Sequence, residues 1–193
     1  MLSKRIILFS LLIGFSFICK AQTVSRINMV VSDHTASLKS VEFLHINTPY
    51  CVGLNGNFIQ RPGTENNLSL TYYDEFDGQQ NIIGKLKSIG SVKVTYYSEF
   101  DGFDNIGKLK SIGDTKITYY DRFDGGDNIG KLKSIGDTKI AYYTEFDGFD
   151  NIGKLKSIGN TKITYYDRFD ISQPTGKIKS IDGDDPYLNI ITI

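Results

Sequence analysis

Residues 117–139 read ITYYDRFDGGDNIGKLKSIGDTK. This 23-residue stretch decides the fold, because close copies of it precede and follow it. Repeats at a fixed period indicate an array of similar supersecondary units. The first copy carries one extra residue, in the Ile82-Ile83 doublet. The five copies are Leu70–Lys93, Val94–Lys116, Ile117–Lys139, Ile140–Lys162 and Ile163–Asp185.

Each copy reads as two strands. In the third copy, Ile117–Phe123 is rich in β-branched and aromatic residues, Asp124–Asn128 has turn composition, and Ile129–Ile135 is the second strand. Gly136-Asp137 then joins one copy to the next, with glycine where a type II′ turn needs a positive φ. The predicted fold class is all-β: an elongated antiparallel β-meander of five tandem hairpins, with no helix in 70–193.

The two kinds of turn predict one consistent register. The glycine link places Ile135 opposite Thr138, and a five-residue turn at 147–151 places Tyr142 opposite Lys156. Strict alternation then assigns each side chain to a face. One face would carry Ile140, Tyr142, Phe146, Ile152 and Ile158 with Lys154 and Lys156, and the other Ala141, Tyr143, Glu145, Gly153, Leu155 and Ser157.

Neither predicted face is free of charge. We therefore expect a single twisted sheet or open solenoid whose units contact mainly their neighbours, rather than a thick sandwich. Partial closure of the sheet is the alternative. The second tyrosine of each pair is predicted to cover the strand glycine of the preceding copy, as Tyr143 would cover Gly130. The first tyrosine is predicted to lie between two lysines.

The regions outside the array are not repeats. Residues 22–69 are predicted to form an N-terminal β cap region, with strands at Val24–Val31 and Ser40–Ile46. The array occupies 70–185. Residues 186–193 are predicted to form a C-terminal capping strand.

The N-terminus has the pattern of an export signal. Lys4 and Arg5 precede an apolar run, Ile6–Ile18, and Ala21 precedes the predicted cleavage site. Residues 1–21 would be removed, which places the protein in the periplasm, at the outer membrane or outside the cell. Lipid attachment at Cys19 and a retained N-terminal anchor are the alternatives.

Charge and cysteine content narrow the partners. Cleavage would remove three basic residues and leave 19 basic against 22 acidic residues, a net charge of −3. This balance disfavours nucleic acid and anionic lipid as partners. Cys51 would be the one cysteine of the mature chain, so no intramolecular disulfide is expected. No transmembrane span is predicted in the mature chain, and the oligomeric state stays open.

The pattern GKLKSIGDTKITYYDRFDG at 107–125 resembles the short hairpin repeats of the MORN type. The resemblance covers 70–185, although Asp, Ser or Thr follows the tyrosine pair where those repeats have YxG. The tyrosine pairs are also similar to cell-wall-binding repeats of the choline-binding and clostridial-toxin type, which rely on tryptophan. Both resemblances imply non-enzymatic binding or scaffolding in an elongated β array, and neither transfers a binding residue.

The first tyrosines of four pairs are the candidate binding residues. Equivalent tyrosines in successive copies would lie about 9.6 Å apart, two strand spacings. Such a ladder could stack on the sugar rings of a glycan or engage a repetitive protein surface; the alternative is that the rings only stabilise the sheet. The ladder consists of Tyr96, Tyr119, Tyr142 and Tyr165.

The aspartate-rich turns are weak metal candidates. One turn supplies about three oxygen ligands, whereas calcium takes six to eight. Ordinary turn chemistry explains these residues equally well, so we predict no metal and no cofactor. The carboxylates concerned are Asp101, Asp104, Asp124, Asp127, Asp147 and Asp150.

The sequence offers no catalytic motif. Asp33-His34, Glu42, His45 and Cys51 are acid–base or nucleophilic types without a catalytic spacing. We predict an exported, non-catalytic binding or scaffold module for a glycan or a protein surface. A purely structural cell-envelope protein and a calcium-stabilised adhesin-like repeat are the alternatives.

Overall fold

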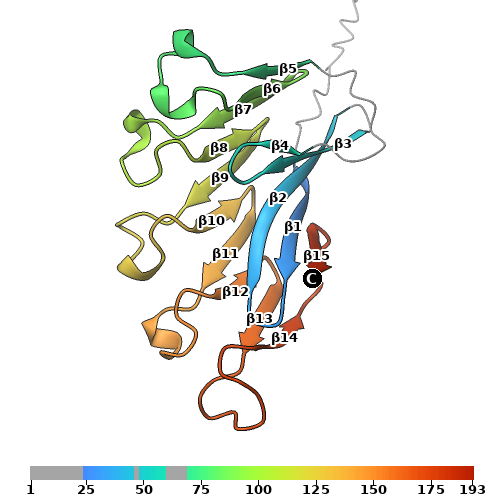
Figure 1. Cartoon of the computed structure of the whole chain (residues 1–193), viewed down its shortest axis with the longest axis vertical. Coiled ribbons are helices and arrows are strands. Elements are labelled where there is room, and N and C mark those ends of the chain that lie inside the picture. Colours follow the sequence, from blue (N-terminus) through green and yellow to red (C-terminus); the bar gives the residue numbers. More distant parts are fainter. Residues whose placement is uncertain (1–23, 46–47, 60–68) are drawn as a thin grey trace, which may run out of the picture.

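The computed structural model describes residues 24–45, 48–59 and 69–193, apart from the side chain of His45. The predicted signal sequence, its cleavage site and Cys19 lie outside these residues. Two sheets make up the described part of the chain (Figure 1). The larger is an open ten-stranded antiparallel meander in which β5 to β14 follow one another in chain order, so the predicted fold class is confirmed. No helix in the described residues is long and apolar enough to cross a membrane.

The strands of the array are short. Each repeat supplies two of them, and the sheet is built from β5 (Leu70–Tyr72), β6 (Leu86–Ile89), β7 (Val92–Tyr96), β8 (Leu109–Ile112), β9 (Thr115–Tyr119), β10 (Leu132–Ile135), β11 (Thr138–Tyr142), β12 (Leu155–Ile158), β13 (Thr161–Tyr165) and β14 (Ile178–Asp182).

The links between repeats are as predicted. Ile135 lies opposite Thr138, and Gly136 between them has a φ of 57°. This left-handed conformation costs glycine little and costs other residues about 1–2 kcal/mol. The equivalent Gly90, Gly113 and Gly159 also have a positive φ.

The register within each repeat departs from strict alternation. Ile140 pairs with Ile158 as predicted, but a β-bulge follows, and Tyr142 lies opposite Leu155 rather than Lys156. A bulge sets two residues of one strand against one of its partner and shifts every later side chain. The predicted face assignments are therefore wrong beyond the bulge.

The bulge gives the array an apolar face. Leu155 and Ile158 are three residues apart, yet both are buried, while Lys156 and Ser157 between them are only half-buried. The same buried pattern recurs in β6, β8 and β10. The expectation that charged residues interrupt both faces was wrong, because it assumed an unbroken period of two.

The second sheet covers this face. Its strand order is β15-β1-β2-β3-β4, and β15 pairs with β1 in parallel. β1 and β2 run along the long axis of the array and cross the strands of several repeats (Figure 1). The strands are β1 (Val24–Val31), β2 (Ala36–His45), β3 (Thr48–Gly53), β4 (Phe58–Ile59) and β15 (Leu188–Thr192).

One continuous core lies between the sheets. Ile27, Met29 and Phe43 of the smaller sheet join the buried leucines and isoleucines of the array. Burying such side chains stabilises the fold by about 1.5–3 kcal/mol each.

Three hydrogen bonds tie the smaller sheet to the second and fifth repeats. The amide of Val24 donates to Thr115 Oγ1, Tyr96 Oη donates to the carbonyl of Gly56, and the amide of Ile178 donates to the carbonyl of Asp33.

The tyrosine pairs connect neighbouring repeats. Tyr143 Oη donates to the carbonyl of Ile163 at 3.0 Å, and its ring meets that of Tyr165 edge to face at 5.8 Å. The carbonyl of Tyr143 accepts from the amide of Gly153 of its own repeat. The atom within 4 Å of where a Cβ on Gly130 would stand is Lys108 Nζ and not a Tyr143 atom, so the predicted cover of Gly130 by Tyr143 is wrong. Each paired tyrosine except Tyr72 lies under one lysine, as Lys131 lies over Tyr142 and Lys156 over Tyr143.

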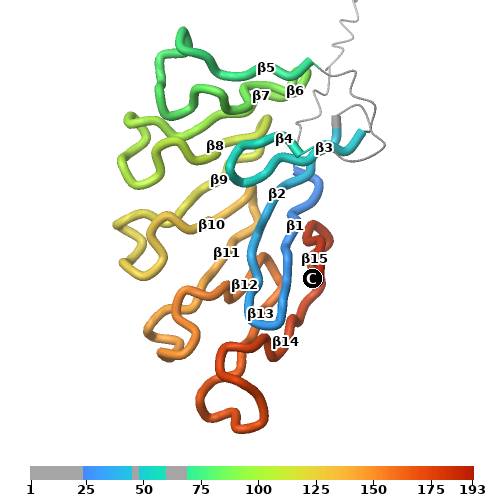
Figure 2. The backbone as a smooth tube through the Cα atoms, viewed as in Figure 1, coloured from blue at the N-terminus to red at the C-terminus, as the bar shows by residue number. Residues whose placement is uncertain are grey.

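The loops inside the repeats all project at one edge of the array (Figure 2). They are longer than predicted, because the strand expected over Ile117–Phe123 ends at Tyr119 and the next begins at Leu132. Short 3₁₀ turns form in them at Glu75–Asp77, Gln80–Ile82, Glu99–Asp101, Gly126–Asn128 and Glu145–Asp147.

Candidate functional site: a row of exposed phenylalanines on the loop edge

Each loop is held by a carboxylate that caps its own first turn. In the second repeat, Asp101 Oδ2 accepts hydrogen bonds from the amide of Ser98 at 3.0 Å and from its hydroxyl at 2.9 Å. The amide of Asp101 donates back to the Ser98 carbonyl. This reciprocal cap satisfies backbone groups that a single 3₁₀ turn would leave open. Asp77 and Asp147 cap their loops in the same way.

The capping carboxylate also pairs with a lysine of the following strand. Lys110 Nζ lies 2.5 Å from Asp101 Oδ1, and this hydrogen bond, with those from Ser98, lowers the pKa of Asp101 to about 2. The loop is thereby fastened to β8. The corresponding pairs in the other repeats are Lys87–Asp77, Lys133–Asp124, Lys156–Asp147 and Lys179–Asp170.

Ion pairs between repeats fasten successive loops to one another. Arg122 donates from Nη2 to Asp104 Oδ1 at 2.8 Å and from Nε to Oδ2 at 3.1 Å, a two-point contact that fixes the geometry. Arg168 and Asp150 repeat this contact between the fourth and fifth loops. Asp127 accepts from the amide of Glu145 and joins the third loop to the fourth.

This framework leaves the phenylalanine at one equivalent position of every loop in solvent. Each follows the first residue of the loop turn, between a charged residue and the capping aspartate. Its side chain contacts little, since the exposed fractions are 89% for Phe76, 90% for Phe100, 90% for Phe123, 91% for Phe146 and 83% for Phe169. We call these five residues the loop phenylalanines. Neighbouring members are about 9.6 Å apart along the array, two strand spacings.

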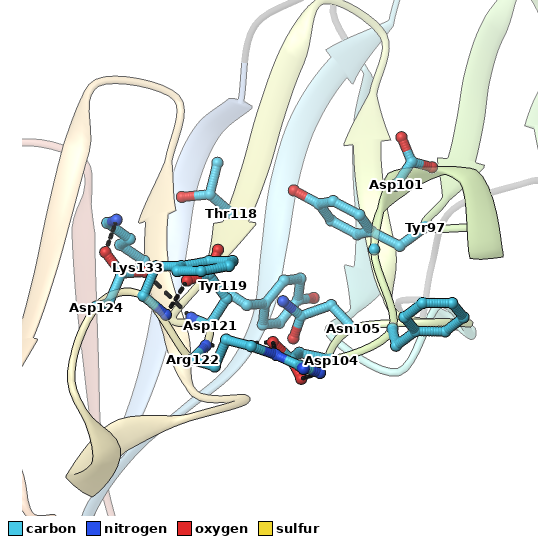
Figure 3. Close-up of a pocket in the computed structure, with 13 residues that line it drawn as sticks. Tyr97, Asp101, Asp104, Asn105, Thr118, Tyr119, Asp121, Arg122, Asp124 and Lys133 are labelled. Atoms are coloured by element: carbon cyan, nitrogen blue, oxygen red, sulfur yellow. Dashed lines mark hydrogen bonds and ion pairs between the residues drawn. The ribbon is translucent and has the colours of Figure 1, made fainter.

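Two clefts open between the loops. The first, of about 520 Å³, lies between the second and third loops and is lined by Phe103, Arg122 and Phe123, with Asp104 across from Arg122 (Figure 3). The second, of about 380 Å³, lies between the fourth and fifth loops and contains Phe149 and Arg168 in the same places. Phe103 and Phe149 are about three-quarters exposed.

The clefts recur every second repeat. Phe103 and Phe149 are 46 residues apart, and the third loop has Gly126 at this position instead. Arg122 and Arg168 are likewise 46 residues apart, with Glu145 between them. This period of two repeats was a signal in the sequence that reasoning on single repeats missed.

The predicted tyrosine ladder does not form an exposed surface. Tyr96, Tyr119 and Tyr165 are buried beneath the smaller sheet, and Tyr142 is half-buried. Burial raises the pKa of all four hydroxyls, to about 12 for Tyr142. A ladder that stacks on an extended ligand requires a free ring face at all four positions, and these rings instead pack in or against the core. The regular spacing of the tyrosines favoured them as binding residues, whereas the exposed aromatic side chain that every repeat shares is the phenylalanine of the turn.

Five of the six candidate calcium ligands take part in the ion pairs described above. Asp101, Asp124 and Asp147 each pair with a lysine, and Asp104 and Asp150 each pair with an arginine. Nearby cations lower the pKa of all five carboxyls. Within the described ranges, no three His, Cys, Asp or Glu side chains are grouped to hold a metal ion.

The acid–base residues of the N-terminal region lie apart from the loops. Asp33 and His34 belong to the turn between β1 and β2, whereas Cys51 is buried in β3 opposite Glu42. Asn28 Nδ2 donates to Glu42 Oε1 at 3.2 Å and lies 3.8 Å from Cys51 Sγ. These contacts form a buried polar network inside the smaller sheet. The side chain of His45 lies outside the described part of the structure.

Comparison with known proteins found no matching family model, no matching curated protein and no matching solved structure. The loop edge is therefore interpreted from its own geometry.

Proposed function

We propose that this protein is an exported, non-catalytic binding scaffold whose loop phenylalanines engage the surface of a protein partner in the cell envelope. The observation that supports the proposal is the exposure of all five loop phenylalanines at equivalent positions. Large apolar side chains that are grouped on the exposed surface of a protein usually mark an interaction site.

Rigid presentation favours binding. The loops are fastened to their strands by the Asp101–Lys110 type of pair and to each other by the Asp104–Arg122 type. A partner would therefore meet preorganised rings and would lose little conformational freedom of the loops. Aromatic anchors surrounded by polar groups are the usual composition of a binding hot spot.

The chemistry of the edge favours a protein over a glycan. A phenylalanine ring donates no hydrogen bond to a sugar hydroxyl, and the carboxylates beside it are already occupied by lysine or arginine. An elongated protein with apolar pockets matches these rings better. The resemblance to MORN-type repeats, which implies scaffolding, is consistent with this proposal.

The test compares two matched triple variants of the full mature chain. One variant replaces Phe100, Phe123 and Phe146 by serine, and the control replaces Lys116, Lys139 and Lys162, which are exposed on the sheet of the same repeats, by serine. Both immobilised variants and the wild type would be exposed to solubilised envelope proteins and to an envelope glycan panel.

We expect a protein component to be retained by the wild type and the lysine variant but lost from the phenylalanine variant, with all three chains unfolding at the same temperature. Equal retention by all three chains would contradict the proposal. Retention of glycans alone would contradict a protein partner and would indicate a carbohydrate ligand instead.

A further inference from the structure

A second candidate site lies on the other side of the array, where the smaller sheet ends. A cavity of about 390 Å³ opens between the turn joining β1 to β2 and the third, fourth and fifth repeats. Its walls are Leu38 of β2, Leu132 and Leu155 of the array, and the rings of Tyr142 and Tyr165. Figure 1 places this turn over the lower part of the array, near β13. The volume and the mostly apolar lining are those of a small-molecule site.

The cavity breaks the symmetry of the array. The first tyrosine is 5% exposed in the second repeat, at Tyr96, and 6% exposed in the fifth, at Tyr165, whereas Tyr142 between them is only half-buried. The repeats are nearly identical in sequence here, so the difference comes from what covers them. The smaller sheet packs on Tyr96 through Gly56, but near Tyr142 it leaves a gap.

The charge of the cavity is positive. Lys154 and His34 are its ionisable lining groups apart from the tyrosines, and it has no acidic lining residue. Lys154 has no ion-pair partner among the described residues, unlike the lysines of the loop edge. Burial lowers the pKa of Lys154.

Lys154 also has fewer hydrogen bonds than Lys108 and Lys131, its equivalents in the second and third repeats. Lys108 and Lys131 each donate to a glycine carbonyl of the next repeat and to an asparagine Oδ1 of their own. Lys154 donates to the carbonyl of Gly176, while the matching Asn151 Oδ1 is buried without a hydrogen-bond partner. An ammonium group has three donors. Lys154 Nζ, 4.7 Å from the centre of the Tyr165 ring that lines the cavity, therefore keeps donor capacity beside it.

We propose that this cavity binds a small amphiphilic carboxylate, with its apolar tail between Leu38, Leu132 and Leu155 and its carboxylate on the ammonium of Lys154. At about 30 Å³ per water-sized group, the cavity holds about a dozen non-hydrogen atoms. Decanoate is a probe of this size, and decanol is its uncharged counterpart. This site does not depend on the loop phenylalanines.

The test is calorimetric titration of the mature chain with decanoate, below the concentration at which it forms micelles. Three variants accompany the wild type. Leu38→Trp fills the cavity, Lys154→Met removes the cation, and Lys108→Met removes the equivalent lysine of the second repeat, which does not line the cavity. The thermal unfolding of each variant shows whether it is folded.

We expect saturable binding of decanoate by the wild type and by Lys108→Met. Lys154→Met should weaken it about 10-fold to 100-fold, the effect of losing one hydrogen bond to a charged group, and should leave decanol binding unchanged. Leu38→Trp should abolish both. If that variant does not fold, the comparison of decanoate binding by Lys154→Met and by Lys108→Met tests the proposal alone.

The proposal is overturned if the wild type shows no saturable binding. It is also overturned if Lys154→Met and Lys108→Met weaken decanoate binding equally, or if a folded Leu38→Trp binds as the wild type does.

Discussion

Tyr120 Oη donates a hydrogen bond of 2.9 Å to the backbone carbonyl of Ile140, which belongs to the following repeat. The same bond joins each of the first four repeats to the next. The bond joins two residues about twenty positions apart in the sequence. They belong to different repeats, so the hydrogen bonds within one hairpin do not connect them. The equivalent pairs are Tyr73 with Val94, Tyr97 with Ile117, and Tyr143 with Ile163.

Removing this hydroxyl should weaken the array. We expect Tyr120→Phe to lower the free energy of unfolding by about 1 kcal/mol, because one net hydrogen bond is lost and the ring contacts remain. Urea denaturation measures the change. The control is Tyr166→Phe, since the hydroxyl of Tyr166 makes no hydrogen bond to any described residue. An equal loss in both variants would contradict a bond-specific effect.

For the buried hydroxyl of Tyr119, we expect removal to have the opposite effect on stability. Tyr119 Oη is buried without a hydrogen-bond partner, whereas Tyr165 Oη donates to the carbonyl of Leu155 at 3.0 Å. A buried polar group without a partner costs about 1–3 kcal/mol. Tyr119→Phe should therefore leave stability unchanged or raise it, while Tyr165→Phe should lower it by about 1 kcal/mol. Chemical denaturation of both variants checks the sign, and a destabilised Tyr119→Phe would refute the assignment.

The capping aspartates predict acid sensitivity. Lysine pairing lowers the pKa of Asp101 to about 2 in the folded state, below its unfolded value. The ionised form is thus favoured by folding, so its contribution is complete above about pH 4 and disappears as the pH falls toward about 2. Asp77, Asp124, Asp147 and Asp170 are shifted in the same direction.

Urea midpoints measured between about pH 5 and about pH 2.5 should fall steadily for the wild type. Asp101→Asn should be less stable at neutral pH and lose less on acidification. Asp114→Asn, in an exposed link between repeats, should keep the full acid response. An Asp101→Asn variant with the wild-type pH profile would show that this pair does not contribute.

The sequence was sufficient for features that depend on local chemistry. The glycine links, the pairing of Ile135 with Thr138 and the meander follow from turn preferences and from alternation over a few residues. The bulge at Leu155 and Lys156 was not predicted, because strict alternation was extended through a four-residue strand. The spacing of three between Leu155 and Ile158 was the available signal, since two buried residues three apart on one face require a bulge.

The packing of the smaller sheet on the array could not be predicted from local sequence patterns. Ile27, Met29 and Val31 alternate as a half-buried strand does, but the pattern does not say which surface they cover. The structure lays them over the array, where they share one core with Tyr96, Tyr119 and Tyr165. The candidate binding residues thus moved from the tyrosines to the loop phenylalanines, whose loops are joined by ion pairs such as Asp104–Arg122.

Site-specific photo-crosslinking tests the central claim, that the loop edge binds a protein, most directly. A benzophenone amino acid would replace Phe123 or Phe146 in the full chain, in the cells that normally express it. The control position is Asp114, which lies exposed at the opposite edge of the array. We predict that both loop positions crosslink to the same protein and that position 114 does not. Equal crosslinking from all three positions, or none from the loops, would contradict the account.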